Sequence, residues 1–187
     1  MGARIEQRVA HLGGGQGAMP MQIYARISRA IQRPHQSEAA LGVALRPFSG
    51  RAPLNIGIER RIALDNSARD AFALVAAGGL NPARVVGPVV AEGYAQAGMV
   101  GLSRQDLFVD GRISLGVPLD RAERTRLGLS LSGGAQPGVS RLDIGPMIET
   151  RLPLGGVNPR LVVEWRHRVT GQARPGSGLS VTLASDF

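Results

Sequence analysis

Residues 107–117 read Leu-Phe-Val-Asp-Gly-Arg-Ile-Ser-Leu-Gly-Val, and this stretch decides the predicted fold. Its apolar and polar residues alternate: Leu107, Val109, Ile113, Leu115 and Val117 take one parity, and Asp110, Arg112, Ser114 and Gly116 take the other. Successive side chains of a β-strand point to opposite faces, so this period of two predicts a strand with one apolar and one polar face.

The same alternation recurs along the chain in segments that clusters of Gly, Pro, Asn and Asp separate. The segments predict eleven strands, at about 3–12, 20–31, 38–47, 53–64, 70–80, 88–100, 106–119, 125–134, 142–154, 160–169 and 178–187. Residues 3–12 fit a short helix equally well, which would leave ten strands. The pattern predicts an all-β, antiparallel up-and-down fold.

Two environments remain open for such strands. A soluble β-barrel or sandwich buries the apolar face, whereas a membrane barrel turns it toward lipid and keeps the polar face in its lumen. Strand length favours the membrane, because about ten residues tilted by about 40° span about 25 Å, the height of the outer-membrane apolar band. We therefore expect a transmembrane β-barrel of about 10–12 strands.

The predicted polar face carries charges of both signs among small Gly, Ala and Ser residues, as in a narrow barrel interior that ion pairs close. The expected lumenal charges are Arg26, Arg46, Glu59, Arg61, Glu92, Asp110, Arg112, Glu149, Arg151, Glu164, Arg166 and Arg168. Within this set, the expected pairs on adjacent strands join Arg112, Arg151 and Arg166 with Glu149, Glu164 and Asp110. We expect these pairs to fill most of the lumen. A solvated sheet face is the alternative.

The last segment places Leu179, Val181, Leu183 and Phe187 on one parity. It resembles the terminal signature of bacterial outer-membrane proteins, an amphipathic final strand ending in an aromatic residue that the barrel-assembly machinery recognises. The resemblance implies that these four residues form an assembly signal. Ser185 departs from the pattern, because an apolar residue is usual at that position.

Two features oppose a lipid-facing surface. Aromatic residues make up only 4% of the chain, although Phe48, Phe108 and Phe187 fall near segment ends, where membrane barrels have aromatic girdles. Arg60 takes the apolar parity inside its segment, and an arginine facing lipid at the midplane costs about 2–4 kcal/mol. A bulge at residues 59–61 or a displaced register would re-aim Arg60.

The N-terminal end shows no signal peptide after Met1, which an exported protein requires. In addition, single-chain bacterial barrels have an even number of strands and both termini on the periplasmic side. Eleven strands would leave the first one starting outside the cell. We therefore expect residues 1–187 to be one barrel domain, the C-terminal portion of a longer protein, with at least one further strand upstream.

Composition argues against other classes of function. All 22 basic residues are arginine, which arginine-rich codon use in a GC-rich genome explains. They are dispersed and accompanied by few aromatic residues, so no nucleic-acid partner is expected. The absence of cysteine excludes disulfides and thiolate metal sites.

Enzymatic chemistry is not expected. His11, His35 and His167 lie in separate segments without a metal-binding motif, so no metal or cofactor site is predicted. Ser130 and Ser132 lack the surroundings of a nucleophile elbow, and we interpret them as small lumenal residues.

Several stretches together resemble one protein family. They are LGVALRPFSGRAPLNIGIERRIAL (41–64), GYAQAGMVG (93–101), LSGGAQPGVSRLDIGP (131–146), VEWRHRVTG (163–171) and ARPGSGLSVTLASDF (173–187). They resemble the C-terminal β-barrel of uncharacterised outer-membrane proteins of alphaproteobacteria, especially sphingomonads. More distantly, they are similar to the barrels of phage-adsorption receptors and exopolysaccharide-export porins. The resemblance carries no functional residues.

The expected function is therefore a non-catalytic pore, surface receptor or polysaccharide-export channel in the outer membrane. Its expected partners are outer-membrane lipid, the barrel-assembly machinery, and a polysaccharide or phage ligand. The alternative is a soluble β-barrel or sandwich that binds a ligand or protein partner.

Overall fold

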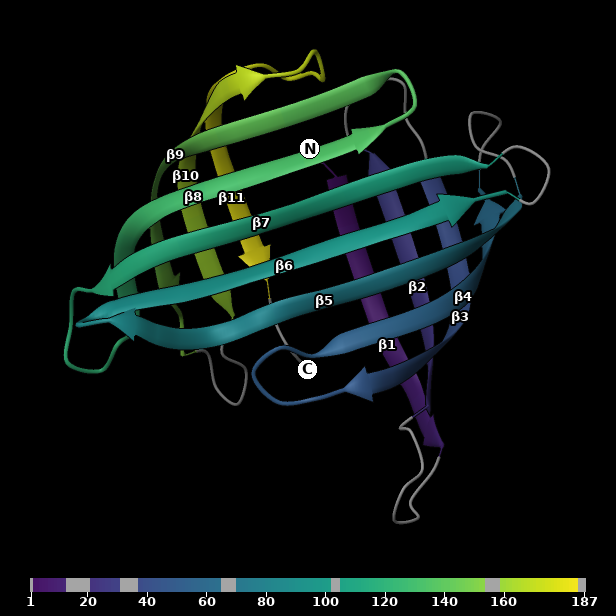
Figure 1. Cartoon of the computed structure of the whole chain (residues 1–187), viewed down its shortest axis with the longest axis horizontal. Coiled ribbons are helices and arrows are strands. Elements are labelled where there is room, and N and C mark those ends of the chain that lie inside the picture. Colours follow the sequence, from purple (N-terminus) through teal and green to yellow (C-terminus); the bar gives the residue numbers. More distant parts are fainter. Residues whose placement is uncertain are drawn as a thin grey trace. The chain divides into compact units, whose positions relative to one another are not determined.

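The computed structural model describes residues 2–12, 21–30, 37–64, 70–101, 105–153 and 159–184 of the chain, with side chains from 21–25, 38–64, 70–101, 105–153 and 159–183. The strands, labelled in Figure 1, are β1 (Gly2–Leu12), β2 (Met21–Ala30), β3 (Ser37–Phe48), β4 (Leu54–Ala63), β5 (Ala71–Val86), β6 (Val89–Val100), β7 (Asp106–Pro118), β8 (Thr125–Gln136), β9 (Val139–Arg151), β10 (Arg160–Thr170) and β11 (Gly178–Ala184).

The strands pair in chain order, β1 to β11, in an antiparallel sheet. The predicted all-β, antiparallel up-and-down fold is confirmed. Residues 2–12 form a strand that pairs with β2, so the helical alternative for the first segment is wrong. A short amphipathic segment fits either periodicity, and here cross-strand pairing selects the extended form.

Two hairpin turns lie at other positions than the sequence predicts, which lengthens the strands beside them. Asn81-Pro82 is a turn signal, yet β5 continues to Val86 and the chain reverses at Gly87, where φ is 51°. Proline is compatible with extended backbone, whereas a positive φ favours glycine. In the same way, β8 and β9 extend to a tight turn at Gly138, with φ of 78°.

The chain divides into two compact units. Unit 1 comprises residues 1–78 and 96–108, and unit 2 comprises residues 79–95 and 109–187. Each unit has one face that carries its buried polar residues and one that carries exposed large apolar residues, and we call these its inner and outer faces.

In unit 1 the inner face is polar and filled by small residues. Ala40, Ala44, Ala71 and Ala73 are buried there beside Gln22, Tyr24 and Glu59. The outer face exposes the large apolar side chains of Leu41, Val43, Leu45, Phe48, Ile56, Ile58, Ile62, Phe72 and Leu74. Both faces follow the period-two pattern of the sequence.

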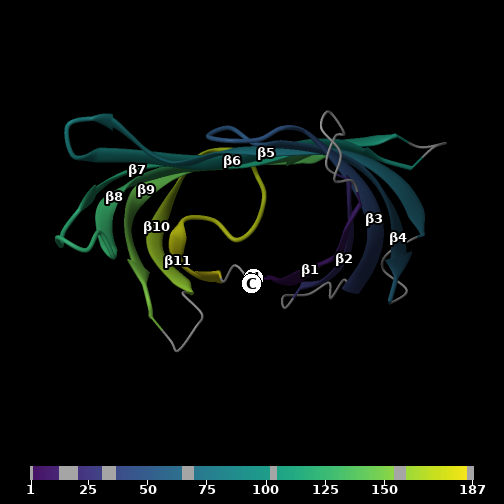
Figure 2. The ribbon, with the colours of Figure 1, turned by 90° about the horizontal axis from the view of Figure 1, so that it is seen from below.

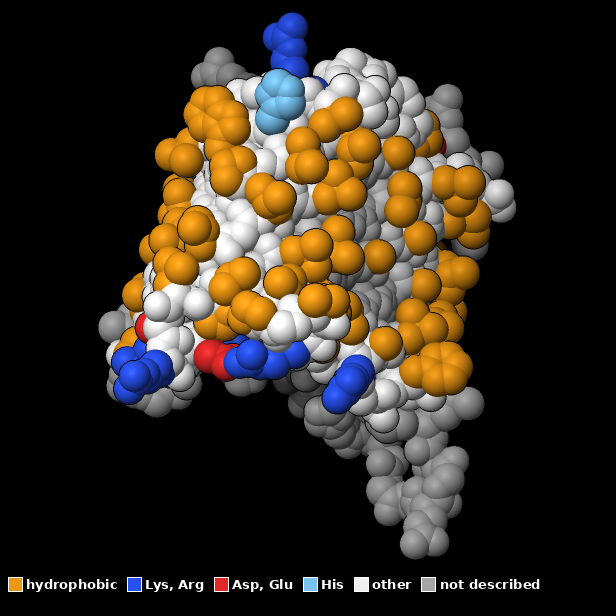
Figure 3. All heavy atoms as spheres, turned by 60° about the vertical axis from the view of Figure 1, so that its left-hand side comes forward, with side chains coloured by type: hydrophobic (Ala, Val, Ile, Leu, Met, Phe, Trp, Pro, Cys, Tyr) orange, Lys and Arg blue, Asp and Glu red, His pale blue; other side chains and the backbone are white. Residues whose placement is uncertain are grey.

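Unit 2 repeats this division. Strands β8 to β11 follow one another along an arc in Figure 2, and the inner face of the unit buries Ser114, Arg126, Ser130, Asp143, Glu149 and Glu164. The outer face exposes Val109, Ile113, Leu115, Val117, Leu127, Leu129, Leu131, Ile144, Ile148, Trp165, Val169, Leu179, Val181 and Leu183. Hydrophobic side chains are spread over the face shown in Figure 3, whereas most of its charged side chains lie at its lower margin.

Because Gly42 has no side chain, the ring of Tyr24 can lie against it on the inner face of unit 1. Gly42 and Tyr24 are cross-strand partners on β3 and β2. A Cβ atom at Gly42 would lie 2.5 Å from Cζ of Tyr24, which is closer than non-bonded carbon atoms approach. The ring is held in this position because the Tyr24 hydroxyl donates a hydrogen bond of 3.0 Å to Oε2 of Glu59.

Replacing Gly42 with alanine should therefore displace the Tyr24 ring and lower the free energy of unfolding by about 1–3 kcal/mol. Urea unfolding followed by circular dichroism measures the loss. Gly176→Ala is the control, because nothing lies within 4 Å of a Cβ atom there. In a Tyr24→Ala background, Gly42→Ala should cost much less, and an equal cost in both backgrounds would contradict the steric explanation.

Candidate functional site

The inner face of unit 2 collects ion pairs around carboxylates that are almost completely buried. The side chains of Asp143, Glu149 and Glu164 are 0%, 1% and 2% exposed. A buried carboxylate is tolerated only when cations and hydrogen-bond donors surround it, so each of these three fixes the positions of nearby arginines.

The first group joins four strands through Glu92, Arg126, Glu149 and Arg160. Arg126 on β8 contacts Glu149, its cross-strand partner on β9, and Nη2 of Arg126 lies 3.0 Å from Oε2 of Glu92 on β6. Arg160 on β10 pairs with Glu92 and lies 3.8 Å from Oε2 of Glu149. Two carboxylates and two guanidinium groups thus balance one another.

The second group surrounds Glu164 on β10. Nη2 of Arg112, on β7, lies 3.0 Å from Oε2 of Glu164, and Nε of Arg166 donates a hydrogen bond of 2.5 Å to Oε1. The Ser130 hydroxyl, on β8, donates a hydrogen bond of 2.9 Å to Oε2. Ser130 therefore acts as a donor to a structural carboxylate in this arrangement.

The third group fixes the connection between β10 and β11. Asp143 pairs with Arg141 and, at 2.5 Å, with Nε of Arg168. The same Arg168 guanidinium donates hydrogen bonds to the carbonyl oxygens of Ala173 (2.6 Å) and Pro175 (2.8 Å). Arg168 thus links a buried carboxylate on β9 to the backbone of the following turn.

The expected pairing on adjacent strands is wrong for Arg112 and Arg166, whereas Glu149 pairs on adjacent strands but with other arginines than expected. Arg112 on β7 reaches Glu164 on β10, three strands away in the sheet order, and Arg166 pairs with Glu164 of its own strand. Glu149 pairs with Arg126 and Arg160. The side chains of a curved sheet converge on its inner face, so long arginines reach beyond the neighbouring strand.

A cavity of about 910 Å³ opens beside the first two groups. Its lining consists of Leu80, Asn81, Pro82, Glu92, Gly93, Tyr94, Arg112, Ala122, Arg124, Arg151, Pro153, Arg160, Val162, Glu164, Arg166 and Thr182. All of these residues belong to unit 2. Five arginines and two glutamates therefore give the wall an excess of positive charge.

The turn between β7 and β8 holds Arg124 at the wall of this cavity. The Asp120 carboxylate accepts hydrogen bonds from the backbone N–H groups of Arg124 (2.9 Å) and Thr125 (2.8 Å). These hydrogen bonds hold the pKa of Asp120 below its ordinary value, since they favour the charged carboxylate. The turn is consequently closed at both of its ends by one side chain.

Unit 1 has a smaller polar network on its inner face. Nε of Arg61 lies 2.7 Å from Oε1 of Glu59 and 3.8 Å from Oε1 of Glu38. The Arg61 guanidinium also lies over the ring of Phe108, 5.5 Å from its centre. Phe108 therefore belongs to the inner face, although it lies near the start of β7.

A second network in unit 1 is centred on Asn55. Its Oδ1 accepts hydrogen bonds from Nε of Arg46 at 2.9 Å and from Nε2 of Gln22 at 3.1 Å. Arg46 was expected among the inner charges, and here it donates to an amide oxygen. Gln22 and Asn55 were not singled out by the sequence, because neutral amides carry no charge signal.

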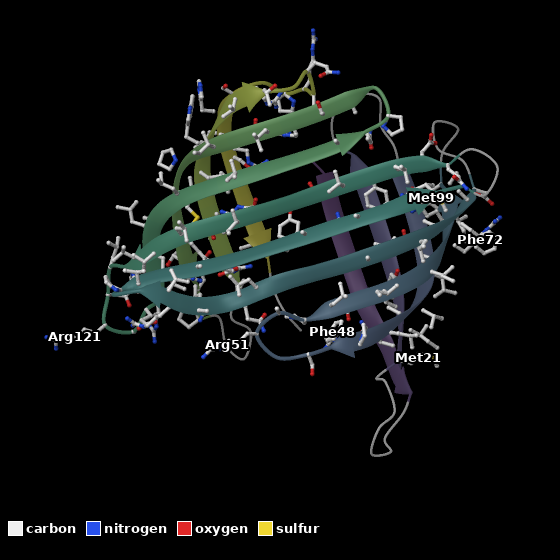
Figure 4. All side chains as sticks on the ribbon, in the orientation of Figure 1. Met21, Phe48, Arg51, Phe72, Met99 and Arg121 are labelled. Carbon is white, nitrogen blue, oxygen red and sulfur yellow. The ribbon has the colours of Figure 1, made fainter. Side chains whose placement is uncertain are left out.

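Arg60 lies on the outer face without a bulge. The register of β4 with β3 and β5 runs continuously through residues 59–61, so neither a bulge nor a displaced register re-aims it. Instead, Nη2 of Arg60 lies 3.2 Å from Oδ2 of Asp70, and its guanidinium lies 4.8 Å from the centre of the Phe72 ring. Phe72, labelled in Figure 4, lies at the outer margin of the strands. Arg60 is the seventh of the ten residues of β4, and its partner Phe72 is the second residue of β5.

The remaining expected residues are distributed as follows. Asp110 on β7 is half-buried on the inner face, and Arg151 is exposed at the end of β9, on the cavity wall. Leu179, Val181 and Leu183 lie on the outer face of β11. Phe187, His35 and the side chains of Arg26 and His11 lie outside the described residues.

Three arginines of the ion-pair groups were missed by sequence reasoning, namely Arg126, Arg141 and Arg160. Each shares the parity of a residue that was recognised: Arg126 with Ser130, Arg141 with Asp143, and Arg160 with Glu164. Extending the alternation to both ends of each strand would have found them. The alternation of polar and apolar residues includes all three arginines, but they lie at strand ends, where a sequence pattern defines boundaries least well.

Comparisons with known proteins give no relative for this chain: no family model matches it, and no curated protein matches it. Within the described ranges, no helix is long and apolar enough to cross a membrane. Among the same residues, no three His, Cys, Asp or Glu side chains gather as metal ligands would.

The buried ion pairs should dominate the stability of unit 2. Glu149→Gln keeps the shape of the side chain but removes the charge that faces Arg126, and breaking a buried pair costs about 3–5 kcal/mol. The matched control is Glu123→Gln, which breaks the exposed pair with Arg84; such pairs contribute about 0–1 kcal/mol. Urea unfolding midpoints compare the two variants, and similar losses would show that burial of the Glu149 pair is not important.

Proposed function

We propose that this chain is part of an outer-membrane β-barrel that acts, without catalysis, as a pore, surface receptor or polysaccharide-export channel. The observation that carries the proposal is the inverted distribution of side chains. In each unit the outer face exposes large apolar residues, and the opposite face buries ion pairs and polar groups.

Physical chemistry supports lipid as the medium for the outer face. Single exposed apolar residues are ordinary on a soluble protein, but a continuous apolar surface much larger than a few hundred Å² marks an interface with a membrane or a protein. In unit 2 such residues occupy alternate positions along β7, β8 and β9. A sheet that spans lipid needs this outer pattern and a polar interior.

The dimensions and pairing of the strands support the same proposal. β7 and β9 each have 13 residues, and β8 has 12. About 9–11 tilted residues suffice to cross the hydrocarbon core of a membrane. Antiparallel neighbours satisfy one another's backbone groups, as a medium without water requires.

Arg60 is compatible with this proposal because of its position and partners. Its partner Phe72 is the second residue of β5, and at this end of β5 Arg60 would lie toward the membrane interface, where an outward arginine costs about 0–1 kcal/mol. Asp70 and the face of Phe72 contact its guanidinium there. An amphipathic side chain can keep its charged end near the headgroups while its stem stays in an apolar environment.

The proposed partners follow from the proposed location. Outer-membrane lipid would cover the outer faces, and the barrel-assembly machinery would recognise the apolar residues of β11, which are exposed at Leu179, Val181 and Leu183. A polysaccharide or a phage is the proposed ligand class for an export channel or receptor. No nucleic-acid partner is proposed.

The location is tested by fractionating cells that express the full-length protein from its native gene. We expect it in the outer-membrane fraction, and we expect its mobility in SDS gels to change on heating, because membrane barrels resist unfolding by unheated SDS. Recovery as a detergent-free soluble monomer would overturn the proposal in favour of a soluble binding module.

The medium that contacts the outer face is tested by placing an arginine in the middle of a strand. Ile113 lies near the middle of β7 and is 46% exposed. If lipid covers it, Ile113→Arg should cost about 2–4 kcal/mol, whereas a substitution at an exposed soluble surface usually stays within about 0.5 kcal/mol.

Leu119→Arg is the matched control, because Leu119 is 58% exposed but lies in the turn after β7. Its cost should be small in either medium. Urea unfolding in liposomes measures both variants. Equal and small effects of Ile113→Arg and Leu119→Arg would count against lipid contact.

A further inference from the structure

The cavity on the inner face of unit 2 has more positive charge than its own carboxylates neutralise. Arg112, Arg124, Arg151, Arg160 and Arg166 line it, with Glu92 and Glu164 as its only acidic lining residues in the described part of the chain. Both glutamates are already occupied, because Arg126 and Arg160 contact Glu92, and Arg112 and Arg166 contact Glu164.

Arg124 and Arg151 supply the excess. Across the described ranges, neither guanidinium lies within ion-pair distance of a carboxylate. The two residues are neighbours, because the backbone N–H of Arg151 donates a hydrogen bond of 2.9 Å to the carbonyl oxygen of Arg124. Two cations without acidic partners thus lie together on one wall, where their mutual repulsion favours an anion between them.

The backbone fixes this pair before any ligand arrives. Asp120 closes the β7–β8 turn on the Arg124 and Thr125 N–H groups, and the Leu119 N–H donates to the Thr125 carbonyl oxygen at 2.8 Å. Arg151 ends β9, whose pairing with β8 runs without interruption from Val139 to Thr150. Both arginines therefore extend from rigid elements, which lowers the entropic cost of binding.

We propose that this cavity binds a multiply charged anion through its phosphate or carboxylate groups, with Arg124 and Arg151 as the principal binding residues. The planar guanidinium group binds both kinds of anion with two parallel hydrogen bonds. A volume of about 910 Å³ accommodates a small organic anion. Tyr94, Pro82 and Val162 provide apolar wall for the remainder of such a ligand.

This inference deepens the proposed function, on which its physiological meaning rests: in a pore or export channel, the cavity would select anionic solutes. Binding itself does not require a membrane. It can therefore be measured on the purified, folded chain whether or not the chain proves to be an outer-membrane protein.

The test is isothermal titration calorimetry of the full chain with two probes, tripolyphosphate and citrate, at an ionic strength of about 0.15 M, where exposed charges are screened. Arg124→Gln and Arg151→Gln should each weaken binding by about tenfold, the effect of losing one charged hydrogen-bonding group. The probe that binds more tightly assigns phosphate or carboxylate as the preferred group. Neither variant removes a member of the ion pairs described for unit 2, and circular dichroism verifies the β-sheet content of both.

Arg121→Gln is the matched control. Arg121 is in the same turn as Arg124, is exposed, does not line the cavity, and points away from the strands in Figure 4. It removes the same charge, so it should leave the affinity for either probe within about twofold, because exposed charges are screened. An equal loss in Arg121→Gln would show non-specific attraction and overturn the proposal, and so would the absence of binding by both probes.

Failure of this inference is distinguishable from failure of the proposed function. Outer-membrane fractionation and heat-modified mobility do not depend on Arg124 or Arg151. A membrane-inserted protein that binds neither probe would refute the anion site alone. A soluble protein that binds tripolyphosphate through Arg124 and Arg151 would refute the membrane location and retain the site.

Discussion

The structure of unit 2 depends on the requirement that a buried carboxylate be matched by a cation. Asp143, Glu149 and Glu164 are almost inaccessible to solvent, and each is contacted by two arginines. Desolvating such charges is costly, and their mutual attraction compensates only when geometry is good. The inner face is therefore held by directional contacts between charged groups. This leaves the large apolar residues free for the opposite face.

Small residues make this arrangement possible. The inner face of unit 1 accommodates Tyr24 because Gly42 has no side chain, and Phe108 lies where a Cβ atom at Gly98 would be 2.7 Å from its ring. Long side chains on one strand thus fill space that a glycine on the next leaves empty. The many glycines of the chain consequently serve packing as well as turns, which composition alone does not distinguish.

Alternation predicted the fold because the period of two is a property of the strand itself, visible wherever the two faces differ in polarity. The same parity indicated that Glu59, Glu149 and Glu164 share the buried face. Partners could not be predicted, since they depend on curvature: Arg112 contacts Glu164 across three steps of the sheet order. The position of Arg60 could not be explained from the sequence either, because its contacts with Asp70 and Phe72 are what accommodate an arginine on the apolar parity.

The reach of the inner arginines has a consequence for the order in which unit 2 can form. Arg112 and Glu164 are 52 residues apart in the chain, and Arg160 and Glu92 are 68 apart. A hairpin of β9 and β10 formed alone would contain Glu164 and Arg166 but not Arg112, the second cation of Glu164, which lies on β7. Within that hairpin Arg166 still pairs with Glu164, and Arg141 and Arg168 pair with Asp143. The contacts of Arg112 with Glu164 and of Arg160 with Glu92 therefore form only after β7 and β6 have joined β10, and contacts of such sequence separation make folding slow.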